Sequence, residues 1–116
     1  MNIKIECLLE CENHLGEGPV WDVKEGCLYW VDGTGRRVDK PAVWRMDPKT
    51  GKVENWHVNK DVGAIALRKD GNAVMALADG FYFFDFDSGQ YELITEIEAD
   101  QPRTRLNDGK CDRRGR

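Results

Sequence analysis

The sequence has no apolar run that approaches 18 residues, so it contains no candidate transmembrane helix. Its first residues, 1–7, carry charge where a signal peptide needs an apolar segment, and we therefore expect a cytoplasmic protein. Positively charged residues are outnumbered by negatively charged ones, since the chain has 17 Lys and Arg and 21 Asp and Glu, which gives a formal net charge of −4. Beyond the short cluster 113–116 there is no basic stripe. We expect neither nucleic acid nor a membrane as a partner.

Signatures that rely on cysteine and histidine are also missing. No two cysteines form a Cys-x-x-Cys pair, and the sequence has only two histidines. This pattern excludes the usual structural zinc sites, and no arrangement of Ser, His and Asp suggests a catalytic triad. We interpret the cysteines as reduced thiols in or near strands. They are Cys7, Cys11, Cys27 and Cys111.

No window shows an apolar stripe with a period of 3.6 residues, so we expect almost no helix and an all-β fold. The chain instead contains short segments that are apolar throughout or that alternate apolar and polar residues. They are separated by turns rich in Gly, Asp and Asn. Nine segments are predicted as strands: Ile3–Leu9, Pro19–Trp21, Cys27–Val31, Ala42–Met46, Val53–Val58, Ala64–Leu67, Ala73–Leu77, Phe81–Phe86 and Tyr91–Ile97.

These strands repeat with a period of about 45 residues, which is typical of a propeller blade built from four short strands. Gly26, Gly71 and Gly115 occupy the same turn in three successive units, at spacings of 45 and 44 residues. The chain holds two units and the start of a third, whereas a closed propeller has roughly 4–8 blades. The polar segment 33–40, between the second and third strands of the first unit, is predicted as a surface loop.

We therefore expect residues 1–116 to form the N-terminal portion of a single, incomplete propeller domain. This portion corresponds to about two and a half blades of four-stranded antiparallel sheet. The alternative is a complete short protein that closes by assembling with copies of itself. The segment Ile3–Leu9 lies outside the repeat.

Two short runs carry the residues best suited to chemistry. Residues 15–21 read Leu-Gly-Glu-Gly-Pro-Val-Trp, and residues 105–110 read Arg-Leu-Asn-Asp-Gly-Lys. Their order and spacing resemble the two N-terminal signatures of the regucalcin (senescence marker protein) and gluconolactonase family, and the resemblance extends from about Ile3 to the last residue. It implies a partial six-bladed β-propeller whose parent is a metal-dependent hydrolase that opens sugar lactones to aldonic acids.

Both runs fall in the loop that enters the innermost strand of a unit, so we expect them to converge at one end of the channel. Glu17 offers a carboxylate to a hard cation there, and a solvated turn glutamate is the alternative. Arg105 and Asn107 offer directional hydrogen bonds to a polyhydroxylated lactone, and a surface salt bridge is the alternative for Arg105. Asp108 is expected to fix the turn. Asp61, in the matching loop of the second unit, is assigned no catalytic part.

The resemblance gives these residues roles. It implies that Glu17 binds one divalent cation (Ca, Zn, Mg or Mn) and that Arg105 and Asn107 bind the sugar lactone. An Asn and an Asp from later blades would complete the metal site, and the Asp would also be the acid/base. We therefore expect no catalytic residue within these 116 residues, little activity from them alone, and a monomeric parent. A non-catalytic calcium-binding regulatory protein of the regucalcin type is the alternative.

Overall fold

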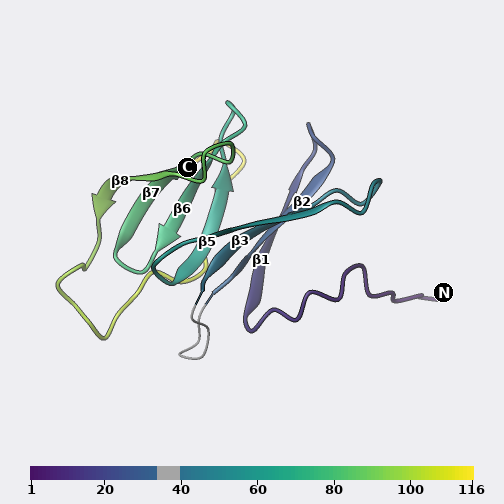
Figure 1. Cartoon of the computed structure of the whole chain (residues 1–116), viewed down its shortest axis with the longest axis horizontal. Coiled ribbons are helices and arrows are strands. Elements are labelled where there is room, and N and C mark those ends of the chain that lie inside the picture. The colour runs from purple at the N-terminus through teal and green to yellow at the C-terminus, as the bar shows by residue number, and fades with distance from the viewer. Residues whose placement is uncertain (34–39) are drawn as a thin grey trace.

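The computed structural model describes residues 1–33 and 40–116, which form two four-stranded antiparallel sheets (Figure 1). Each sheet is a meander in which consecutive strands pair, as in a propeller blade. The first sheet contains β1 (Gly16–Asp22), β2 (Cys27–Asp32), β3 (Ala42–Met46) and β4 (Val53–His57). The second contains β5 (Val62–Leu67), β6 (Ala73–Leu77), β7 (Gly80–Phe84) and β8 (Tyr91–Glu96). The described residues contain no helix long and apolar enough to cross a membrane.

Eight of the nine predicted strands are confirmed, with ends that differ by at most three residues. The prediction of a strand at Ile3–Leu9 is wrong, since this segment has no regular structure and Ile3 and Ile5 are 77% and 89% exposed. A strand is stable only when a neighbour pairs with its backbone, and no described strand pairs with these residues. Figure 1 shows the N-terminal segment running away from both sheets.

The third unit is present only as the segment 105–116, which contains no strand. The predicted loop 33–40 lies mostly outside the described residues. The predicted turn chemistry at the β7–β8 hairpin is clear in the structure. Asp85 Oδ1 accepts hydrogen bonds from the backbone N–H groups of Asp87 and Ser88, and Gly89 adopts φ +69°. The Asp85 side chain therefore caps the backbone N–H groups of its own turn, as is usual for Asp in a hairpin turn.

The core lies between the two sheets, where their apolar faces pack together. The largest fully buried side chains come from both sheets, with Tyr29 and Val43 in the first and Met75, Leu77 and Phe84 in the second. The innermost strand of the second sheet, β5, is buried over its first four residues and contacts β1, β2 and β3. Burial of this face fixes the two sheets relative to each other, and with them the loops that enter β1 and β5.

Candidate functional site

Glu17 lies at the start of β1, beside a β-bulge. It is opposite Val31 of β2, and the register of the two strands shifts between Glu17 and Val20. Gly18 has φ +62°, a left-handed conformation that favours glycine, so the Gly after Glu17 is required by the bulge. Glu17 is exposed, and no described residue forms a hydrogen bond or ion pair with its carboxylate. The carboxylate oxygens are thus available to a ligand.

The second run lies against the start of β5, where glycine permits an unusually close approach. A Cβ at Gly63 would lie 2.4 Å from the carbonyl oxygen of Asn107 and 2.8 Å from its Cα. The backbone N–H of Leu106 donates to the carbonyl of Ala78 at 3.2 Å. The backbone of the second run is therefore held in place by the second sheet, and the missing side chain of Gly63 makes room for it.

Arg105, Asn107 and Asp61 form a small polar group at this end of β5. Nη1 of Arg105 donates to the carbonyl of Leu106 at 3.1 Å and to Oδ1 of Asn107 at 3.2 Å. Its Nε lies 3.9 Å from Oδ2 of Asp61, and the Arg105 and Asp61 side chains are 34% and 33% exposed. The structure thus brings together the two predicted substrate-binding residues and adds an acidic one.

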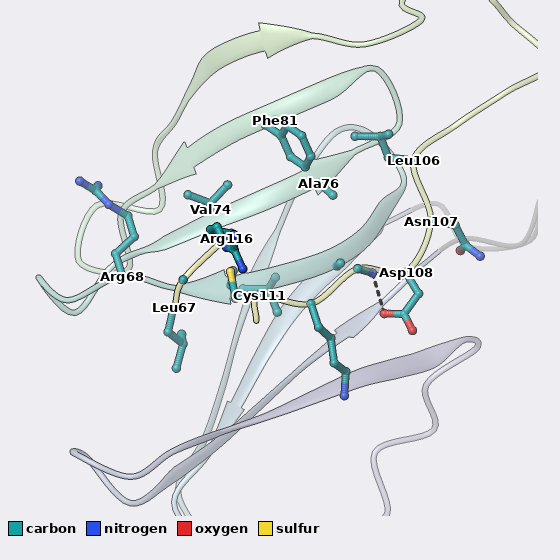
Figure 2. A pocket seen from close by; sticks show the side chains of 16 residues that line it. Leu67, Arg68, Val74, Ala76, Phe81, Leu106, Asn107, Asp108, Cys111 and Arg116 are labelled. Atoms are coloured by element: carbon teal, nitrogen blue, oxygen red, sulfur yellow. Dashed lines mark hydrogen bonds between the residues drawn. The ribbon is translucent and has the colours of Figure 1, made fainter. Parts of the chain in front are cut away.

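Sequence reasoning missed the contact of Asp61 because it assigned this residue no part. The sequence repeat could have indicated this residue, since Asp61 occupies the loop of the second unit that corresponds to the two runs. Asp108 accepts a hydrogen bond from the N–H of Gly109 at 2.8 Å, within its own turn (Figure 2). The contact of Asp108 is therefore local.

Glu17 and Asp61 lie at the beginning of two neighbouring inner strands. Strands β1 and β5 contact each other, and both begin at the lower end of the molecule in Figure 1. No polar contact among the described residues joins Glu17 to Asp61, Arg105 or Asn107. The first run therefore begins β1, and the second run lies against the start of the neighbouring strand β5, without a polar contact between the two among the described residues.

The donor chemistry of Glu17 fits one ligand of a hard divalent cation, which prefers carboxylate oxygens. Within residues 1–33 and 40–116, no group of three or more His, Cys, Asp or Glu side chains is arranged to hold a metal ion. A bound Ca²⁺ takes six to eight oxygen ligands, so one carboxylate supplies only part of such a site. Glu17 can serve as a ligand only together with donors from elsewhere.

A cavity of about 450 Å³ lies beside the second run, on the outer face of the second sheet. Its lining is mainly apolar and includes Val74, Ala76, Phe81 and Leu106 (Figure 2). Figure 2 shows the side chain of Asn107 directed away from these apolar groups. A polyhydroxylated ligand needs directional polar partners, so this surface is suited to packing against another apolar face and not to a sugar.

The loop that carries Asp61 is fixed by a hydrogen-bonded group next to it. Lys60 Nζ donates to Asp79 Oδ2 at 2.5 Å and to the Tyr82 hydroxyl at 2.9 Å. The Tyr82 hydroxyl donates to Asp79 Oδ1 at 3.0 Å. The hydrogen bond from Lys60 holds the pKa of the Asp79 carboxyl below its usual value, and Asp79 raises the pKa of Lys60. This group joins the β4–β5 loop to the β6–β7 turn.

Asp79→Asn in the full-length protein is expected to lower the free energy of unfolding by about 1 kcal/mol at pH 7. The folded state favours the charged carboxyl, so this contribution is present above the ordinary Asp pKa of about 3.9 and is lost as the pH falls below it. Urea unfolding of both proteins at pH 7 and pH 3 measures the effect. If the free energies of unfolding of the two proteins differed by the same amount at pH 7 and pH 3, the charge of Asp79 would not be the source of the stabilisation. Asp87→Asn, at an exposed turn, is the control.

The family model described as "SMP-30/Gluconolactonase/LRE-like region" matches residues 15–116. Regucalcin from Xenopus laevis is 39% identical over 115 residues, which are 99% of this chain and 37% of that protein. A 6-deoxy-6-sulfogluconolactonase from Pseudomonas putida is 34% identical over 116 residues, which are 100% of this chain and 38% of that protein.

A solved structure shares the fold. It is a calcium-binding protein, regucalcin, from Agrobacterium tumefaciens, which superposes with a TM-score of 0.79 at 28% identity. The match covers 90% of this chain and 34% of that one. The chain thus spans little more than a third of the length of the relatives it matches.

Proposed function

This chain belongs to the SMP-30/gluconolactonase/LRE-like family, and we propose that its full-length protein is a metal-dependent hydrolase that opens sugar lactones to aldonic acids. The observation that carries the proposal is the position of Arg105 and Asn107, which the second sheet holds together at one end of β5. A relative named as a lactonase covers the whole chain at 34% identity and supports the reaction class.

The contacts of Arg105 and Asn107 leave donors available for a substrate. Nη1 of Arg105 and Oδ1 of Asn107 bond to each other, and no described residue bonds to Nη2 of Arg105 or Nδ2 of Asn107. The available groups are therefore N–H donors. Such donors suit the hydroxyl and carbonyl oxygens of a lactone, and their mutual hydrogen bond orients them before the substrate binds.

We assign Glu17 as the one metal ligand supplied by these residues. A divalent cation, which we take to be Ca, Zn, Mg or Mn, would polarise the lactone carbonyl and lower the pKa of a water molecule when bound. Glu17 is exposed at the start of β1, next to the strand that positions Arg105 and Asn107. The other ligands and the general base are proposed to come from elsewhere in the full-length protein.

We expect the full-length protein to hydrolyse D-glucono-1,5-lactone, and we expect chelation of divalent cations to reduce this rate by at least about a hundredfold. Proton release at constant pH measures the reaction, and added divalent cation should restore it. Residues 1–116 alone are expected to show little or no activity, because one carboxylate does not complete a metal site. Full activity after chelation would contradict the metal dependence.

A second candidate is a calcium-binding protein without catalytic activity. The observation that favours it is that a solved structure with this fold is described as a calcium-binding protein. Calorimetry with Ca²⁺ and the hydrolysis assay on the same preparation separate the two. Calcium binding without hydrolysis of any aldonolactone favours this second candidate.

A further inference from the structure

Asp61 is the one acidic side chain within ion-pair distance of Arg105 among the described residues. It directly precedes β5, and its neighbour Lys60 is held by Asp79 and Tyr82. The side chain is only one-third exposed, so its carboxylate is partly shielded from solvent by the protein. The backbone that carries this carboxylate is therefore held at the start of β5 by the contacts of Lys60 with Asp79 and Tyr82.

Asp61 and Asn107 contact the Arg105 guanidinium from different sides. Asp61 lies near Nε, whereas Asn107 and the carbonyl of Leu106 accept from Nη1. The two hydrogen bonds at Nη1 orient the planar guanidinium, and the longer ion pair with Asp61 places a negative charge beside Nε. The third nitrogen, Nη2, has no partner among the described residues.

The negative charge of Asp61 offsets the positive charge of Arg105. A neutral hydroxyl on the substrate accepts hydrogen bonds from the fixed N–H donors, and a nearby carboxylate changes its binding energy little. An anionic group on the substrate would be attracted less strongly by an arginine that is already paired with a carboxylate, and Asp61 would repel it. The pair therefore disfavours acidic ligands and leaves hydrogen bonding to neutral ones intact.

We propose that Asp61 is a positioning and specificity-determining residue that makes the full-length enzyme prefer neutral sugar lactones over anionic ones. The proposal rests on the proposed function of Arg105 in binding the lactone. It assigns Asp61 no part in bond making or breaking, since the residue acts through Arg105 and through its own charge.

The test uses two lactones that differ at one carbon. D-Glucono-1,4-lactone carries a neutral hydroxymethyl group where D-glucaro-1,4-lactone carries a carboxylate. We expect the full-length protein to prefer the neutral lactone in kcat/KM by at least about tenfold. Asp61→Asn should reduce this preference by about tenfold, mainly through a lower KM for the anionic lactone. Asp61→Glu, which keeps the charge, should preserve the preference.

Asp87→Asn is the matched control, because it removes the same charge from an exposed turn at the far end of β7. It should leave the preference within about twofold. An unchanged preference in a folded Asp61→Asn protein would overturn the proposal, as would a preference that falls equally in both variants. If the unaltered protein hydrolyses neither lactone, the proposed function fails. The ratio of the two Kd values, from calorimetry, then decides the inference, and absence of binding to both overturns it.

Discussion

Replacement of Glu17 by Gln is expected to lower metal-dependent lactone hydrolysis by the full-length protein about a thousandfold. Loss of a charged ligand removes the cation, and the polarisation that it provides contributes several kcal/mol, with each factor of ten in rate corresponding to about 1.4 kcal/mol. Glutamine keeps the size of the side chain, and Glu17 is exposed and unbonded to the described residues, so stability should change little. Steady-state rates with D-glucono-1,5-lactone, at saturating and limiting metal, measure the effect.

Glu92→Gln provides the control for charge, since this residue is exposed in β8, the outermost strand of the second sheet. We expect it to retain full activity. Glu17→Asp should retain part of the activity, because the carboxylate remains but is drawn back by one methylene group. If Glu17→Gln kept its activity and its metal affinity, Glu17 would be a solvated strand residue and the metal ligands would have to be sought elsewhere.

Gly63→Ala is expected to reduce kcat/KM by about a hundredfold, although the alanine side chain itself would contact no substrate. The added Cβ would lie 2.4 Å from the carbonyl oxygen of Asn107, and the atoms it meets are backbone, so the second run must move. A displacement of about 1 Å is enough to separate Arg105 and Asn107 from a bound substrate. Overpacking at this position should also cost about 1–3 kcal/mol in the free energy of unfolding.

Gly109→Ala is the matched control, because a Cβ there meets nothing within 4 Å and the residue has no positive φ. Its effect on kcat/KM should stay within about threefold. Kinetics at a temperature well below the unfolding midpoint separate loss of the site from loss of the fold. Unchanged kinetics in Gly63→Ala would show that the position of the second run does not matter for catalysis.

Most of the strands could be predicted from the sequence because their signals are local. The alternation of apolar and polar residues and the turn glycines at 26 and 71 depend only on neighbouring residues, and the repeat follows from them. The prediction at Ile3–Leu9 used the same local signal and was wrong. Whether an alternating segment becomes a strand depends on a partner for its backbone, which the segment itself does not encode.

The candidate site, too, could be predicted only in part from the sequence. The sequence alone identified the residues with suitable chemistry, Glu17, Arg105 and Asn107, because carboxylate, guanidinium and amide groups can be recognised without coordinates. Only the tertiary structure showed that Asp61 lies beside Arg105 and that Gly63 makes room for Asn107. These contacts join residues more than forty positions apart, and they exist because burial of β5 against the first sheet fixes where the third unit begins.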